Sequence, residues 1–327
     1  MQGLMNRRAS ELLGVLSALA ACSLPLQAQN YPAKPVRLIA PFPAGGSSDL
    51  IARIVAQRLS EGFSNQVIIE NRPGAGSNLG SQIAARAAPD GYTLLITNVA
   101  AAINVSLFKN PGYDLMKDFA PIGKLAVGPT ALVVHPSVPA YNVREFIKLA
   151  QSRPGQLNYG SGGNGTPAHI CGEMFRLMAK VNISHVPYKG TGQSVTDLMA
   201  GQIQFVFASM PVAFPHMKTG RLRTLAVTGA ARTPLAPHLP TVAEAGIPGY
   251  AFDSWWGLVT NAAAPPAIVG TLNTELRRVL QLPDVKERFA DLGIDVAQST
   301  PAELASFTRA EIDRFAKIIR DTGIRAD

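Results

Sequence analysis

Short apolar runs alternate with amphipathic windows along most of this chain. The apolar runs are rich in β-branched and aliphatic residues, and they predict strands at residues 36–40, 67–69, 93–96, 131–134, 205–207 and 222–227. Between them, apolar residues recur at helical spacing and predict helices at residues 49–60, 79–87, 143–151, 168–179 and 192–199. Strands that are apolar throughout are typical of sheets covered on both faces. The alternation therefore predicts an α/β fold of mostly parallel sheets flanked by helices.

The last third of the chain has a helical pattern with few strands. Residues 265–293 and 301–319 are predicted to be helical. Thr300 is a good N-cap residue, Pro301 suits the first helical position, and Glu303 falls in the first turn. We expect these helices to dock on the core.

Two stretches that contain proline and glycine suggest where the chain crosses between domains. They are Gly128-Pro129 and Ile247-Pro248-Gly249-Tyr250. Crossings there make domain 1 discontinuous, with residues 29–128 and 255–327, and leave residues 129–254 as domain 2. Two crossings form a hinge, with a ligand cleft between the domains.

Two segments repeat one design: a strand, a glycine-rich turn and a helix opened by small polar residues. The first turn is Ala44-Gly45-Gly46-Ser47-Ser48, and the second runs from Gly160 to Thr166. A helix N-terminus offers free N–H groups and partial positive charge, so it binds anions without Lys or Arg. The pair predicts a clamp on a small anion. The alternative is that each turn serves folding alone.

The N-terminus has the pattern of an export signal. Arg7 and Arg8 precede an apolar stretch at residues 12–26, and Ala28 is a small residue suited to cleavage. The stretch is short for a membrane-spanning helix. We expect residues 1–28 to be removed and the product to be periplasmic. A lipid anchor at Cys22 is the alternative, because Leu19-Ala20-Ala21-Cys22 resembles a lipobox.

Charge and cysteine content exclude several classes of protein. The full chain has a net charge of +8, with its basic residues scattered, so the charge does not indicate a nucleic-acid site. Only Cys171 remains after residue 28, so no internal disulfide forms. Stability must therefore come from a hydrophobic core.

Familiar catalytic motifs are incomplete. The stretch from Gly160 to Gly165 matches G-x-G-x-x-G, but no acidic residue follows at residues 184–189 to bind a ribose. The nucleophile elbow fails because Tyr159 stands where glycine is required. A nucleotide cofactor and a metal site are not expected. An exported hydrolase that uses Ser161 or Cys171 stays open as the alternative.

Three polar residues near these segments have both structural and functional interpretations. Asp49 complements the helix dipole, or it accepts a hydrogen bond from a ligand. Asp253, near the proposed return crossing, joins the candidate site. His169 follows the second glycine loop and either lies in the cleft or serves structure only.

Several motifs, in order, resemble the Bug family, the substrate-binding proteins of tripartite tricarboxylate transporters. The resemblance extends over essentially the whole chain expected after cleavage. Its motifs are Tyr31-Pro32-Ala33-Lys34-Pro35-Val36-Arg37, Pro41-Phe42-Pro43-Ala44-Gly45-Gly46-Ser47-Ser48-Asp49, Glu70-Asn71-Arg72-Pro73-Gly74-Ala75-Gly76-Ser77, Pro89-Asp90-Gly91-Tyr92-Thr93-Leu94, Leu157-Asn158-Tyr159-Gly160-Ser161, His185-Val186-Pro187-Tyr188-Lys189-Gly190, Leu239-Pro240-Thr241-Val242-Ala243-Glu244-Ala245-Gly246 and Trp255-Trp256-Gly257-Leu258.

The resemblance implies a two-domain periplasmic binding fold of the second type that closes on a small carboxylate. It implies ligand-binding positions in the first loop, the second loop and two strand ends: Phe42, Ala44, Gly45, Gly46, Ser47, Asp49, Ser161, Gly163, Asn164, Gly165, Thr166, Thr97, Asn98, Ala208 and Ser209.

The expected function is therefore capture of a carboxylate and its delivery to a membrane permease, by a monomer without enzymatic activity or cofactor. A sensing module that presents its ligand-bound form to a receptor is a further alternative. Dicarboxylates, tricarboxylates, acidic amino acids, aromatic acids and nicotinate-like compounds all fit two helix N-termini.

Overall fold

The computed structural model describes residues 31–325. The expected export signal at residues 1–28, and with it Cys22, lies outside the described residues. Every helix and strand named below belongs to the unit that begins at Lys34. Within residues 31–325, no helix is both long and apolar enough to cross a membrane.

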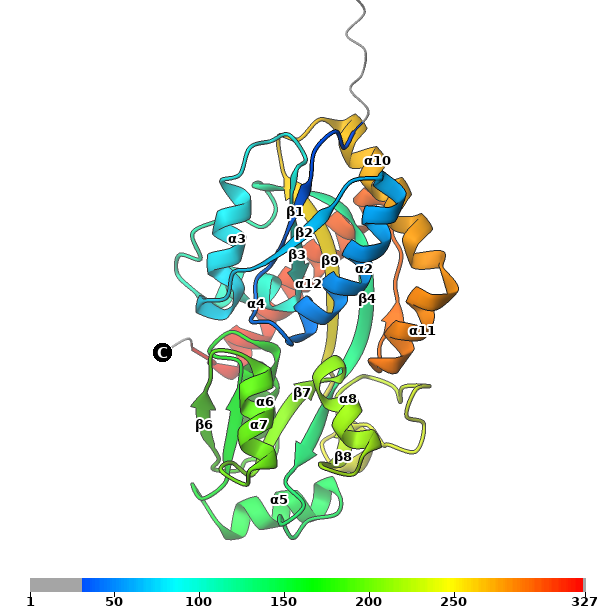
Figure 1. Ribbon diagram of the computed structural model, residues 1–327. Coiled ribbons are helices and arrows are strands. Elements are labelled where there is room, and N and C mark those ends of the chain that lie inside the picture. Colours follow the sequence, from blue (N-terminus) through cyan, green and yellow to red (C-terminus); the bar gives the residue numbers. More distant parts are fainter. Residues whose placement is uncertain (1–30, 326–327) are drawn as a thin grey trace, which may run out of the picture. The chain divides into compact units, whose positions relative to one another are not determined.

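The strands form a mixed sheet in the order β2-β1-β3-β9-β4-β7-β5-β6, with β8 and β10 also paired to β4 (Figure 1). The strands are β1 Val36–Ala40, β2 Val67–Asn71, β3 Thr93–Asn98, β4 Phe119–Val134, β5 Asn158–Ser161, β6 Ser184–Pro187, β7 Phe205–Ser209, β8 Arg223–Val227, β9 Asp253–Asn261 and β10 Asp295–Val296. The predicted α/β class is confirmed.

The predicted parallel pairing holds in two groups of strands. β1 pairs in parallel with β2 and β3, and β5 with β6 and β7. Between these groups, β9 is antiparallel to β3 and β4, and β4 is antiparallel to β7. The two long strands β4 and β9 therefore join one group to the other.

The length of β4 differs from the prediction, which placed a strand only at residues 131–134. Gly128 and Pro129, where a crossing between domains is predicted, lie within the strand, as does Pro121. The ladder with β9 accommodates irregular backbone through register shifts near Pro121 and Lys124. The strand leaves β9 after Pro129 and pairs with β7 from Thr130 onward.

The helices cover the sheet, and several begin at strand ends (Figure 1). They are α2 Ser47–Phe63, the 3₁₀ turn η1 Ala75–Ser77, α3 Asn78–Ala85, α4 Val99–Leu107, α5 Val143–Ser152, α6 Pro167–Met178, α7 Thr191–Met199, α8 Met210–Lys218, α9 Val242–Ala245, α10 Pro266–Gln281, α11 Pro283–Asp291 and α12 Pro301–Thr322.

The helical C-terminal third is present, with one difference from the prediction. The expected helix at residues 265–293 is two helices, α10 and α11, because Pro283 cannot continue the hydrogen-bond ladder of α10. Helix α12 begins as predicted, with a capping box in which Thr300 and Glu303 each accept a backbone N–H from the other residue.

Helix α2 illustrates how the pattern places a helix N-terminus. Ile51, Val55 and Leu59 are fully buried at helical spacing, so one face of α2 packs on the core. The helix ends where Ser64 adopts a left-handed conformation, with φ 51°. Since β1 ends at Ala40, the glycine turn between them sets the N-terminus of α2 at the strand's carboxyl end.

Candidate functional site

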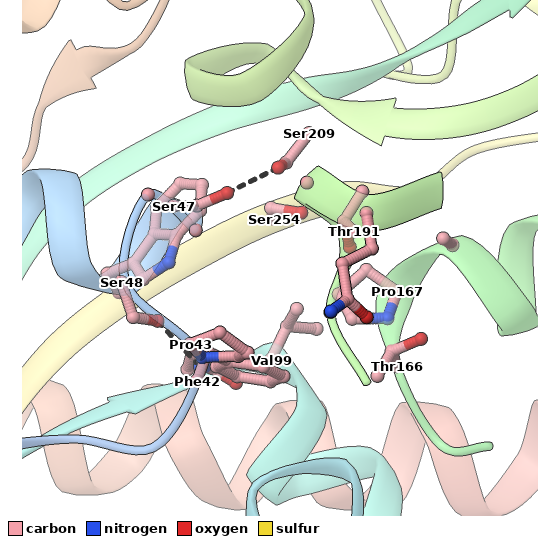
Figure 2. Close-up of a pocket in the computed structure, with 18 of the residues that line it drawn as sticks. Phe42, Pro43, Ser47, Ser48, Val99, Thr166, Pro167, Thr191, Ser209 and Ser254 are labelled. Carbon is pink, nitrogen blue, oxygen red and sulfur yellow. Dashed lines mark hydrogen bonds between the residues drawn. The ribbon is translucent and has the colours of Figure 1, made fainter. Parts of the chain in front are cut away.

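A cavity of about 400 Å³ lies where several strand-to-helix turns meet (Figure 2). It is lined by the turn before α2, the starts of α4, α6, α7 and α8, and the strands β7 and β9. The lining residues are Phe42, Pro43, Ala44, Gly45, Gly46, Ser47, Ser48, Asn98, Val99, Thr166, Pro167, Ala168, Gly190, Thr191, Gly192, Gln193, Thr196, Phe207, Ser209, Ser254 and Trp256.

Four helices present uncapped N-termini to this cavity. The N-cap residues Gly46 of α2, Thr166 of α6, Gly190 of α7 and Ser209 of α8 all line it, and none accepts a side-chain capping bond. Such termini carry partial positive charge and unpaired N–H donors. None of the cavity's lining residues, within the described part of the chain, is charged. The cavity is therefore electrostatically suited to an anion.

Two backbone N–H groups of the first glycine loop already have hydrogen-bond partners in the protein. The N–H of Gly46 donates to the Pro43 carbonyl at 3.1 Å, and the N–H of Gly45 donates to Asp49 at 2.9 Å. The Ser47 and Ser209 hydroxyls hydrogen-bond to each other, which ties the starts of α2 and α8 together (Figure 2). The N–H donors left for a ligand are those at the first helical residues.

Asp49 is placed away from the cavity. Its side chain is 2% exposed and accepts two hydrogen bonds from Arg53, at 2.9 and 3.0 Å, and one from Asn71 at 3.0 Å. Burial raises the pKa of Asp49, but the bonds from Arg53, Gly45 and Asn71 outweigh it and hold this pKa below its ordinary value. Asp49 thus fixes the shape of the first loop.

The second glycine loop is shaped by positive φ angles, 106° at Gly163 and 78° at Gly165. Of the five positions predicted in this loop, Thr166 lines the cavity, while Gly163 and Asn164 line a second cavity of about 600 Å³. A Cβ on Gly165 would lie 2.3 Å from the Asn104 amide oxygen, so the loop packs closely on α4.

Ser161 is fully buried and does not line either cavity. Its hydroxyl lies 2.6 Å from His185 Nε2, and it donates to and accepts from the backbone of Gly163. Burial and the nearby His169 hold the pKa of His185 at about 4. His169 is 5% exposed, and its Nδ1 accepts the N–H of Gly165.

Cys171 lies on α6 and is fully buried. Burial raises its pKa far above the ordinary value of a thiol. A protonated, inaccessible thiol is a poor nucleophile.

The remaining predicted positions lie at strand ends or on strands, and only some of them line the cavity. Asn98 and Ser209 line the cavity. Thr97 lines a separate pocket of about 60 Å³, and Ala208 is fully buried. Asp253 precedes Ser254 on β9 and does not line the cavity. Of the whole predicted set, the cavity brings together Phe42, Ala44, Gly45, Gly46, Ser47, Asn98, Thr166 and Ser209.

Some lining residues were not predicted from the sequence. Thr191, Gly192, Gln193 and Thr196 come from α7, whose start repeats the strand, glycine turn and helix design after β6. This repetition in the sequence could have indicated that the start of α7 also lines the site. Ser254 required β9, which the apolar pattern did not reveal. Trp255 and Trp256 lie near the proposed return crossing, where one of the pair could be either in the core or in the cleft wall, and Trp256 lines the cavity.

Residues 31–325 contain no group of three or more His, Cys, Asp or Glu side chains arranged to hold a metal ion.

The family described as "Tripartite tricarboxylate transporter family receptor" matches residues 51–324. Among curated proteins, the BugT protein of Bordetella pertussis is 33% identical over 316 residues, which cover 96% of this chain and 97% of BugT.

Solved structures share the fold over most of the chain. Periplasmic binding protein BugD superposes with a TM-score of 0.87 at 30% identity, covering 90% of this chain and 99% of BugD. An R. palustris protein solved with adipate has a TM-score of 0.87 at 34% identity, with 90% and 99% coverage. MatC of Rhodopseudomonas palustris, solved with malate, has a TM-score of 0.85 at 30% identity, with 88% and 100% coverage. The fold is therefore that of periplasmic binding proteins of the second type.

Proposed function

The chain belongs to the family of tripartite tricarboxylate transporter receptors, and we propose that it captures a small organic carboxylate in the periplasm and delivers it to a membrane permease. The similar structures solved with adipate and malate support the ligand class. The protein releases its ligand unchanged, acts as a monomer and needs no cofactor.

One observation carries the proposal: four uncapped helix N-termini meet at a cavity without charged side chains. A carboxylate satisfies the free N–H donors and the partial positive charges together. A cation would meet the positive ends of these helices with no anion to compensate.

The ligand-binding residues in this proposal come from both glycine loops and from two strand ends. Ser47 binds one carboxylate through its backbone N–H, Gly46 and Thr166 let the ligand approach the helix N-termini closely, and Phe42 and Asn98 shape the wall. The other predicted positions, Asp49, Thr97, Ser161, Gly163, Asn164, Gly165, Ala208 and Asp253, act by holding the loops and strand ends in place.

Closure of two domains accompanies capture in this proposal. Domain 1 consists of residues 29–128 and 255–327, and domain 2 of residues 129–254. The change of partner in β4, from β9 at Pro129 to β7 at Thr130, supports a crossing there. The bond between Ser47 and Ser209 joins the two proposed domains at the cavity.

Two alternatives have less support. A hydrolase would need Ser161 or Cys171 at a surface that substrate reaches, and both are fully buried. A sensing module would use the same cavity and would differ only in its membrane partner. Removal of residues 1–28, or lipidation at Cys22, places the protein outside the cytoplasm in either case.

A thermal-shift screen tests capture. The protein, stripped of carried-over ligand by unfolding and refolding, is heated with small organic acids at neutral pH. A ligand at a hundredfold excess over its Kd stabilises by about 2.7 kcal/mol. We expect a clear rise in Tm with related carboxylates and recovery of the unchanged acid. The absence of a shift with every acid would refute the proposal.

Delivery is tested by pull-down from membranes with and without the acid. Enrichment of permease subunits supports transport, whereas enrichment of a receptor kinase supports the sensing module.

A further inference from the structure

One face of β9 forms a wall of the cavity. Residues two apart on a strand point to the same side, and Ser254 and Trp256 both line the cavity. Trp255, between them, points to the opposite side, where its indole N–H donates to Glu311 of α12 at 3.1 Å. The strand therefore presents a serine hydroxyl and an indole side by side to the ligand space.

Both side chains carry hydrogen-bonding groups that the rest of the described chain does not satisfy. Ser254 is 1% exposed, and its buried hydroxyl has no hydrogen-bond partner (Figure 2). The Trp256 side chain is 3% exposed and lines the cavity, and no hydrogen bond from its indole N–H to another described residue is present. Buried polar groups are nearly always hydrogen-bonded, so the unsatisfied Ser254 hydroxyl beside a cavity indicates that the cavity's occupant supplies its partner, with the Trp256 N–H as a neighbouring donor.

Four other hydroxyls around the cavity already have partners. Ser47 bonds with Ser209, Thr166 donates to the Gly163 carbonyl, and Thr196 donates to the carbonyl of Gly192. Ser254 differs from these serines and threonines because its hydroxyl has no hydrogen-bond partner.

We propose that Ser254 and Trp256 form a second polar subsite, which receives a second acceptor oxygen of the bound acid. This rests on the proposed function, in which the helix N-termini take the first carboxylate. An indole N–H can only donate, so the group at this subsite is an acceptor. The ligand is therefore an acid with a second carboxylate or a carbonyl oxygen, held at two points.

The surroundings of the subsite favour such a group over an ammonium. The cavity lining, as far as the described residues go, includes no carboxylate to pair with a positive charge. The nearest acid in sequence, Asp253, does not line the cavity. An acidic amino acid would bring its ammonium into a space of helix N-termini and hydrogen-bond donors, at a high desolvation cost.

The test compares diacids with monoacids of equal length by calorimetry. Straight-chain α,ω-dicarboxylates of four to eight carbons are each titrated beside the matching monocarboxylate, into ligand-free wild type, Ser254→Ala and Trp256→Phe. Trp256→Phe keeps an aromatic ring but removes the donor and part of the indole's volume. Trp255→Phe is the matched control, because the same change there removes a donor that faces α12.

We expect the wild type to bind at least one diacid at least tenfold more tightly than its monoacid. Each of Ser254→Ala and Trp256→Phe should lower that ratio about tenfold, as for loss of a hydrogen bond to a charged group. Trp255→Phe should keep the wild-type ratio, even with a lower melting temperature.

The outcomes separate the two proposals. Equal affinity for diacids and monoacids, or an unchanged ratio in both folded cavity variants, would overturn the second subsite and leave carboxylate capture intact. Failure of the wild type to bind any acid would refute carboxylate capture itself, and the subsite with it.

Discussion

Asp49→Asn tests whether the buried Asp49 carboxylate stabilises the conformation of the first glycine loop. The substitution preserves shape but leaves one acceptor oxygen where the carboxylate has two. In the wild type those two oxygens accept from Gly45, Arg53 and Asn71. The variant must therefore lose the paired contact with Arg53 and leave a buried donor unsatisfied.

The size of the effect follows from the exposure of each partner. The Arg53 side chain is 54% exposed, so water replaces much of its contact, and that loss is about 0.5–1 kcal/mol. An unsatisfied buried donor at Gly45 or Asn71 costs about 1–3 kcal/mol. The free energy of unfolding should fall by about 2–4 kcal/mol, or about 3–6 °C in Tm at about 2.1 cal/mol/K per residue.

Urea unfolding of wild type and variant measures this difference, with Asp284→Asn as the matched control. Asp284 also lies in the first turn of a helix and pairs with Arg58, but its side chain is 38% exposed. Its loss should cost no more than about 1 kcal/mol. Because the folded pKa of Asp49 is lowered, its contribution is complete above about pH 3.9 and is lost as the pH falls through the folded value.

Two results would refute this reasoning about Asp49. One is an unchanged unfolding midpoint in Asp49→Asn. The other is normal stability with loss of carboxylate affinity, which would show that Asp49 contacts the ligand directly.

Three further predictions follow from single residues. Gly46 has an ordinary φ of −76°, and a Cβ there would make one tight contact, 3.1 Å from the Pro43 carbonyl oxygen, so Gly46→Val should still fold. Because the added side chain blocks the approach to the loop, the variant should bind carboxylate at least about tenfold more weakly by calorimetry. Wild-type affinity in the folded variant would exclude a close approach of the ligand to Gly46. Burial and His169 lower the pKa of His185 from 6.5 to about 4, so the unfolded chain binds the proton first and stability should fall as the pH drops from 6.5 to about 4. Denaturation against pH should show a shallower fall in His185→Gln, and identical slopes would contradict the assignment. The Cys171 thiol is fully buried, so a thiol reagent should label it only after unfolding; rapid labelling of the native protein would show an open route to it.

The sequence was most informative where local chemistry decides the structure. Gly45-Gly46 followed by small polar residues predicted the start of α2, and Thr300-Pro301 predicted the start of α12. In both places, a cap or a glycine turn determines the conformation of residues only a few positions away in the chain. The alternation of apolar runs and amphipathic windows likewise gave the α/β class.

The sequence did not reveal strand pairing between residues far apart in the chain, because such pairing does not depend on local chemistry. Strand β9 contains Gly257 and polar residues, and it is a strand because β3 and β4 flank it on both sides. Its alternation, which turns Ser254 and Trp256 to the cavity, follows from that pairing. The inward turn of Ser161 toward His185 also depends on a neighbouring strand, so the glycine motif did not reveal it.

The central claim is that helix N-termini hold an anionic carboxylate, and titration of an acid against its amide tests it most directly. The dicarboxylate that binds ligand-free wild type most tightly is compared with its diamide, which has nearly the same shape and no charge. We predict that the acid binds at least about a hundredfold more tightly, a difference of about 2.7 kcal/mol. Equal affinities would show that charge is not what this cavity recognises, and would contradict the account.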